Sequence, residues 1–162
     1  MNNLYISEIL KKLNDFTGQG SHSKKVEWLQ KNNSPALQLV LKLAYNDSVR
    51  WTIPEGVPKF KASGAPIDYN FASIHTETRK LSYLWLAPES GGRPMQLNKV
   101  RLESLFIQML ESLHPDEAAV VVAMKDKTLH RLYPLTKDIV RKAFPTLLPE
   151  NTEGQHPPAK DK

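Results

Sequence analysis

The residues in this sequence that most clearly indicate a chemical role are its lysines and arginines, which can bind anions. Two lysines stand at the start of a predicted helix, at 24 and 25, and two more flank Asp126 at the end of another. Ammonium groups beside the backbone N–H groups of a helix start can bind phosphate oxygens. The residues that we expect to contact phosphate are Lys24, Lys25, Lys125, Lys127, Arg131 and Lys137.

The same residue types also have a purely structural interpretation. Cations in the last turn of a helix complement the negative end of the helix dipole. This accounts well for Arg141 and Lys142, which end the last predicted helix. On the sequence alone, the two interpretations have similar weight.

Residues that could perform catalysis do not form a set with the necessary spacing. The five histidines lack zinc-ligand spacing, and the sequence contains neither a cysteine nor a G-x-S-x-G motif. His75-Thr76-Glu77 has the first part of a deaminase zinc motif, but that motif needs two cysteines. We therefore expect a protein that is not an enzyme and that uses no metal or cofactor.

The composition limits the class of protein. The chain has 162 residues and a formal net charge of +5, and 40% of its residues are hydrophobic, which is enough for the core of one domain. Its longest apolar run, 118–124, has seven residues, whereas a membrane helix needs roughly 20. The first residues lack the pattern of a secretory signal. We expect a basic, soluble, cytoplasmic protein that does not bind membranes.

Apolar spacing and capping residues predict an all-α fold, a single compact domain of six or seven helices over residues 1–149. Ser34-Pro35, His114-Pro115 and Thr136 are typical helix starts. The run at 118–124 is apolar on every side, so its helix should be the most buried element. The expected helices are 3–16, 21–31, 34–45, 76–87, 97–113, 115–124 and 136–144.

Residues 46–75 interrupt the helical pattern. Three prolines and two glycines break any helical period there, which predicts a long irregular crossing inside the domain. Such a long connection usually carries function or lies pinned across the surface. The aromatic residues that should pin it are Trp51, Phe60, Tyr69 and Phe71. Residues 150–162 have little apolar content and are expected to form a disordered tail.

Five short segments resemble a family of uncharacterised tailed-phage proteins of about this length. They are PEG at 54–56, ETRK at 77–80, FIQMLE at 106–111, MKDK at 124–127 and AFP at 143–145. The resemblance implies a phage origin, and with it a location in the cytoplasm of an infected host cell. It implies no function.

The opening and closing parts of the chain are also similar to the N-terminal DNA-binding domain of tailed-phage ATP-dependent DNA ligases. The similar stretches are 6–13, 23–45 and 124–150. In those ligases, this all-α domain grips duplex DNA along its backbone and minor groove. The resemblance implies that Lys125, Asp126 and the loop up to Thr136 face DNA, with Lys24 and Lys25 at the front of the site.

The sequence departs from the ligase pattern in three ways. The lysine nucleophile motif K-x-D-G of the ligase catalytic domain is absent, and Lys125-Asp126-Lys127 does not replace it. The loop at 128–135 has no glycine, although ligases often have one there. Residues 51–80 have no ligase counterpart.

These patterns lead to two functional hypotheses. The first is a non-catalytic protein that grips double-stranded DNA, intact or nicked, through its phosphates, like a ligase DNA-binding domain without its catalytic half. Replacing Lys125 and Lys127 by glutamate should then abolish binding without unfolding the domain. The alternative is a phage interaction protein that docks a host or replication protein through residues 46–75. Exposure of Trp51 and Phe60 would favour the alternative.

Overall fold

The computed structural model describes residues 4–53, 55–56, 58–66, 69–70, 72–83, 85–87 and 98–148. These residues form an all-α fold, as the sequence predicts. Its helices are α1 (Ile6–Lys12), α2 (Ser21–Lys31), α3 (Pro35–Tyr45), α4 (Ile74–Tyr83), α5 (Lys99–Ser112), α6 (Pro115–Asp126), α7 (Leu129–Leu132) and α8 (Lys137–Ala143). The tail expected at 150–162 lies outside the described residues. Within the described ranges, no helix has both the length and the apolar character needed to cross a membrane.

Capping side chains begin two helices where the sequence indicates. The Ser34 hydroxyl accepts a hydrogen bond from the Leu37 N–H at 3.1 Å, directly before Pro35 in the first position of α3. The Thr136 hydroxyl accepts from the Ile139 N–H at 3.3 Å at the start of α8. Both bonds satisfy an N–H group that has no partner within its own helix.

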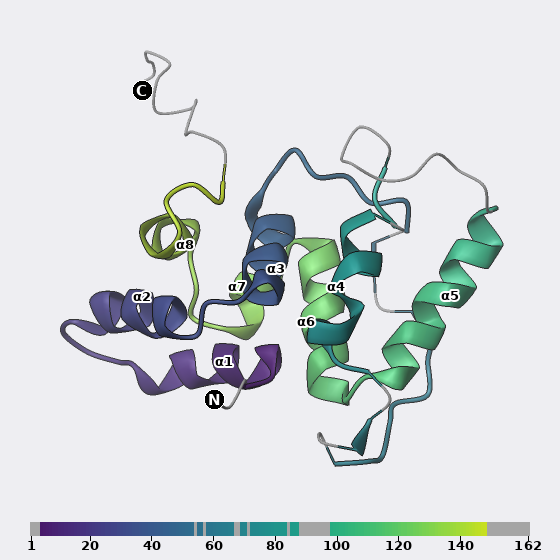
Figure 1. The fold of residues 1–162 in the computed structure, drawn as a ribbon, viewed down its shortest axis with the longest axis horizontal. Helices are drawn as coiled ribbons and strands as arrows, with labels where there is room; N and C mark the ends of the chain where they lie inside the picture. Colours follow the sequence, from purple (N-terminus) through teal and green to yellow (C-terminus); the bar gives the residue numbers. More distant parts are fainter. Residues whose placement is uncertain are drawn as a thin grey trace.

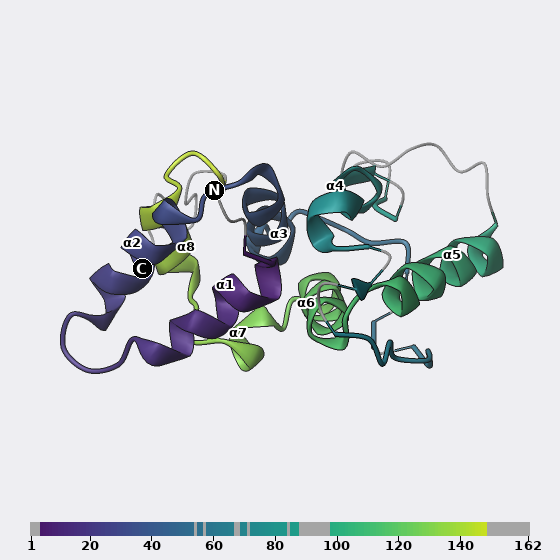
Figure 2. The same cartoon turned by 60° about the horizontal axis from the view of Figure 1, so that its bottom comes forward.

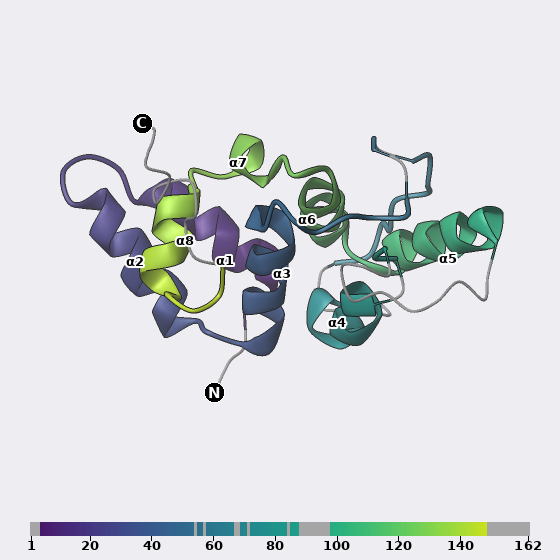
Figure 3. The same cartoon turned by 90° about the horizontal axis from the view of Figure 1, so that it is seen from above.

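The α6 helix lies at the centre of the molecule. It packs against α1 and α3 on one side and against α5 on another, and Figures 1 and 3 show it between these two groups of helices. Its Val120, Val121 and Met124 side chains are fully buried. The molecule is elongated, with the α2–α8 pair at one end and α5 at the other (Figure 2).

A buried carboxylate joins the starts of two helices that are distant in the sequence. Glu117 on α6 is 1% exposed. Its Oε2 accepts the Ser7 N–H of α1 at 2.8 Å, and its Oε1 accepts the Ile74 N–H of α4 at 3.0 Å. Because helix starts carry partial positive charge, one negative side chain stabilises both of them.

Three helices differ from the sequence-based expectation. The helix expected over 76–87 spans Ile74–Tyr83, and Leu86, beyond its end, lies in a β-bridge. The helix expected over 3–16 ends at Lys12, and a 3-10 turn continues to Asp15. Leu129–Leu132 forms a single helical turn in a stretch expected to be a loop, and the described residues therefore contain eight helices rather than six or seven. A four-residue turn is too short to produce a periodic apolar pattern.

The irregular segment between α3 and α4 is attached to the segment that follows α4. The Thr52 N–H donates to the Trp85 carbonyl at 2.8 Å, and the Ala87 N–H donates to the Arg50 carbonyl at 2.9 Å. These bonds flank the isolated antiparallel bridge between Trp51 and Leu86. The crossing is therefore held partly by backbone pairing.

The aromatic residues of the crossing behave in different ways. Trp51 and Phe60 are half-buried and pack against the core, as residues that pin the segment should. Tyr69 is 79% exposed, so the expectation that it pins the crossing is wrong. Phe71 lies outside the described residues.

Candidate functional site

Lys125 and Asp126 form a buried ion pair at the C-terminal end of α6. Lys125 is 4% exposed, and its Nζ lies 2.5 Å from Asp126 Oδ1 and 3.2 Å from the Gly56 carbonyl oxygen. Both oxygens of the Asp126 carboxylate accept the Gly56 N–H, at 3.1 and 3.2 Å. The pair therefore binds both backbone polar groups of Gly56. We call this arrangement of Gly56, Lys125 and Asp126 the Gly56 latch.

The latch holds a backbone conformation that favours glycine. Gly56 has a φ of +110°, in the region that residues with a side chain rarely adopt. A Cβ atom at this position would meet no other atom within 4 Å. The conformation, rather than a lack of space, is therefore the reason for glycine here.

Lys127 closes the end of α3. Its Nζ donates to the carbonyl oxygens of Leu43 at 2.6 Å and Asn46 at 2.8 Å, in the last turn and the C-cap of that helix. Burial lowers the pKa of the Lys127 ammonium group to about 8, although the nearby Asp47 carboxylate acts in the opposite direction. This ammonium group satisfies helix-end carbonyls that otherwise lack donors.

These contacts correct the placement expected for Lys125 and Lys127. The Lys125 side chain is enclosed within the latch, and the Lys127 ammonium group faces carbonyl oxygens of α3. Glutamate at either position would put a negative charge against oxygen atoms in a poorly solvated site. We therefore expect the double replacement by glutamate to destabilise the fold, contrary to the expectation from the sequence.

The α2 and α8 helices lie side by side at one end of the molecule (Figure 1). The Gln30 side-chain amide of α2 donates to the Ala143 carbonyl of α8 at 3.1 Å. With their six cations and two acidic residues, Glu27 and Asp138, these helices have a formal charge of +4. The cations of these two helices, which together we call the α2–α8 basic face, are Lys24, Lys25, Lys31, Lys137, Arg141 and Lys142.

The cations of this face differ in exposure and in partners. Lys24, Lys31 and Lys142 are exposed, whereas Lys137 is partly buried and lies 2.8 Å from the Asp47 carboxylate. The hydrogen bond from Lys137 lowers the pKa of Asp47. Lys142 Nζ lies 3.7 Å from an Asp138 oxygen. Ion pairs this exposed contribute little energy, so they leave the cations available for other anions.

Arg131 lies on α7, beside a hollow of about 500 Å³ along α6. The hollow, which we call the α6 hollow, is lined mainly by apolar side chains, among them Phe60, Val122 and Leu132. Ala119 in its lining is exposed, and so is Leu132, at 46%. The structure therefore shows an apolar surface that the sequence did not indicate.

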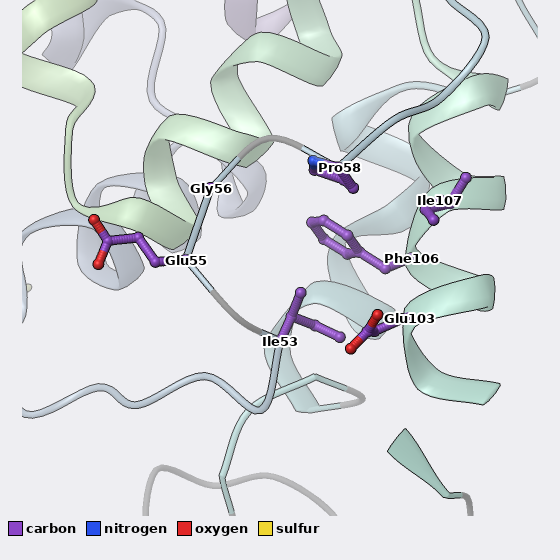
Figure 4. Close-up of a pocket in the computed structure, with 7 residues that line it drawn as sticks. All are labelled: Ile53, Glu55, Gly56, Pro58, Glu103, Phe106 and Ile107. Atoms are coloured by element: carbon purple, nitrogen blue, oxygen red, sulfur yellow. The ribbon is translucent and has the colours of Figure 1, made fainter. Parts of the chain in front are cut away.

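A second hollow, of about 220 Å³, lies on the other side of the same crossing segment. Figure 4 shows the Phe106 ring between Pro58 and Ile53, with the Glu103 carboxylate beside Ile53. The Glu55 carboxylate points away from the Phe106 ring. Glu55 and Gly56 line both hollows, so the latched segment is a wall that the two hollows share.

The six residues expected to contact phosphate thus separate into three groups. Lys24, Lys25 and Lys137 lie on the α2–α8 basic face, Lys125 and Lys127 stabilise the fold, and Arg131 borders the α6 hollow. The basic face also includes Lys31, Arg141 and Lys142, which the phosphate prediction omitted. The sequence places Arg141 and Lys142 on the same outward side of the last helix as Lys137, but their position near its end favoured the helix-dipole interpretation instead.

Metal-binding side chains do not gather in the described parts of the chain. Within them, no group of three His, Asp or Glu residues is placed to hold a metal ion.

Comparison with known proteins places the chain in a family. The model of a family of unknown function, DUF6433, matches residues 9–131, a range that runs from α1 into α7 and includes the Gly56 latch. Neither a curated protein nor a solved structure matches the chain. Because the family match covers well over half of the sequence, this protein belongs to DUF6433, a family of unknown function.

Proposed function

We propose that this protein binds double-stranded DNA through its backbone phosphates, with the α2–α8 basic face as the contact surface. The observation that supports this most directly is the formal charge of +4 on two helices that pack together although they are distant in the sequence. Phosphate contacts position a protein on DNA without reading its sequence. Binding should therefore have little sequence preference.

The start of α2 adds to this surface. Gly20 precedes the helix with a φ of +81°, and no side chain caps the helix start. The N–H groups of such a start attract anions, and Lys24 and Lys25 lie about one turn further along the helix. This helix end therefore offers both backbone donors and positive side chains to phosphate.

The ligase resemblance supports this proposal through its front segment alone. Lys24 and Lys25 belong to the basic face, whereas the MKDK segment at 124–127 takes part in the Gly56 latch and the end of α3. A tailed-phage origin, action in the cytoplasm of an infected host cell and the absence of catalysis are further parts of the proposal. Intact and nicked duplexes are both candidate ligands.

Fluorescence anisotropy with labelled intact, nicked and single-stranded DNA tests the proposal. We expect duplex affinity to fall with salt, with a log–log slope of about −4 if roughly four phosphates are contacted. The Lys24→Glu/Lys142→Glu variant should bind at least about tenfold more weakly and show a smaller slope.

A matched control is Lys99→Glu/Arg101→Glu, which changes the net charge equally at exposed positions of α5, at the other end of the molecule. This control should lose much less affinity than the variant of the basic face. Equal losses would show that net charge alone attracts DNA. An absence of duplex binding at low salt would refute the proposal.

A second candidate function, docking of another protein, is favoured by the α6 hollow. The crossing at 46–75, which the alternative hypothesis assigned to docking, supplies Phe60 and Glu55 to the walls of the hollow. Trp51 and Phe60 pack against the core and are only half-exposed. The hollow itself, rather than exposed aromatic rings, is therefore the feature that supports docking.

A further inference from the structure

The middle of α6, residues 118–124, is apolar on every side, yet the described part of the chain leaves one strip of it open. The helices α1, α3 and α5 cover its other sides. The open strip includes the exposed Ala119 and faces the α6 hollow, which also contains the exposed Leu132. Exposed apolar surface that is concave and contiguous is typical of a binding site.

The wall of this hollow is fixed in place. Asp126 and Lys125 bind the N–H and the carbonyl group of Gly56, so the segment between the two hollows is anchored to the end of α6. A ligand entering either hollow therefore meets a preformed surface and has little chain to order. Preformed sites lose less conformational entropy when they bind.

The charged side chains that line the two hollows are three carboxylates and one guanidinium, those of Glu55, Glu103, Asp126 and Arg131. Glu55 lines both hollows, and Glu103 lines the smaller one. Neither carboxylate has an ion pair or a hydrogen bond with any group in the described ranges, whereas Asp126 is already paired with Lys125. Arg131 lies in the lining of the larger hollow. An occupant with apolar side chains and a positively charged end would complement this surface.

We propose that the two hollows dock an amphipathic peptide segment of another protein, with its apolar side chains along α6 and its lysine or arginine residues beside Glu55 and Glu103. This inference gives the protein-docking candidate a partner of defined chemistry. It does not depend on DNA binding, because the basic face is formed by other helices.

Three labelled helical peptides of about four turns test the proposal. They share one stripe of leucines at i, i+3, i+4 and i+7 and carry lysine, glutamate or glutamine at the remaining positions. We expect micromolar binding of the lysine peptide to the full chain, about tenfold tighter than that of the glutamate peptide. The net charge of +5 would favour the glutamate peptide, so this order of affinities reports the local charge of the site.

Variants of the site separate its apolar and charged parts. Ala119→Gln enlarges a side chain of the lining without changing the charge, and Leu132→Ser removes an exposed apolar side chain, so each should weaken the lysine peptide by about tenfold. Gln19→Ala, in an exposed turn before α2, is the control and should have no effect. Glu55→Gln/Glu103→Gln should make the affinities of the lysine and glutamine peptides equal.

Three outcomes would overturn the proposal. The first is tighter binding of the glutamate peptide than of the lysine peptide, and the second is lysine-peptide binding that neither Ala119→Gln nor Leu132→Ser weakens. The third is a dimer in light scattering that Ala119→Gln dissociates, because a second copy of the chain would then occupy the hollow. The Lys24→Glu/Lys142→Glu variant should bind the lysine peptide normally. Failure of this proposal can therefore be distinguished from failure of DNA binding.

Discussion

The lysines of the α2–α8 basic face and the lysines at the end of α6 have opposite surroundings. On the α2–α8 basic face, Lys24 and Lys142 extend from exposed helix surfaces. At the end of α6, Lys125 and Lys127 are surrounded by carbonyl and carboxylate oxygens of the crossing, of α3 and of Asp126. The role of a lysine is therefore decided by the acceptors that the fold brings to it, and its neighbours in the sequence do not reveal them.

Charge reversal in the latch should produce the largest effect on stability. Lys125→Glu places two carboxylates side by side in a buried site and removes the donor to the Gly56 carbonyl. We expect a loss of about 3–5 kcal/mol in the free energy of unfolding, measured by urea denaturation. Lys24→Glu is the matched control and should change it by less than about 0.5 kcal/mol. Similar values for the two variants would contradict the contrast between the regions.

Neutral replacements sharpen the same comparison. Lys127→Gln removes two hydrogen bonds to the end of α3 and should cost about 1–2 kcal/mol of stability while leaving duplex DNA affinity unchanged. Lys31→Gln should do the reverse and weaken DNA binding about twofold to fivefold at low salt, with unchanged stability. Urea denaturation and anisotropy of both variants check this. If Lys127→Gln lost DNA affinity and Lys31→Gln did not, Lys127 would be a DNA-contacting residue.

The pH dependence of stability tests the surroundings of Lys127 directly. The pKa of Lys127 is about 8 in the folded protein and 10.5 in its ordinary state, so the unfolded chain binds more protons between these values. The free energy of unfolding should therefore rise with pH between about 8 and 10. Above pH 10 the trend reverses, because burial raises the pKa of Tyr133 to about 12 and the folded state then keeps more protons.

Urea denaturation at several pH values between about 8 and 10 measures how the free energy of unfolding changes with pH. Lys127→Gln should remove most of this pH dependence, and Lys31→Gln should leave it unchanged. A slope that persists in Lys127→Gln would assign the effect to another group.

Local sequence signals predict much of this fold. Ser34 and Thr136 mark helix starts because their capping bonds reach only three residues along the chain. The run at 118–124 predicts the central helix because an all-round apolar surface can be buried only between other elements. The length of α1 and the single turn of α7 were beyond this reasoning, since short helices depend on tertiary contacts.

The candidate sites are harder to predict from the sequence than the helices are. Lys125 resembles a surface lysine until Gly56, 69 residues earlier in the chain, is placed beside it. The α6 hollow has walls from the crossing, α6 and α7, and no local pattern joins them. Lys24 is exposed, as an uncapped helix start without a distant partner allows, whereas Lys25 is partly buried. Their binding to DNA remains a prediction.

The Glu117 carboxylate connects two remote parts of the chain to the central helix. Its two oxygens bind the Ser7 and Ile74 N–H groups, so the starts of α1 and α4 both lose a partner whenever α6 shifts. A displacement of Glu117 would therefore leave both helix starts without this acceptor at the same time. A disturbance of α6, such as a ligand pressing on Ala119, would reach both helix starts through a single side chain.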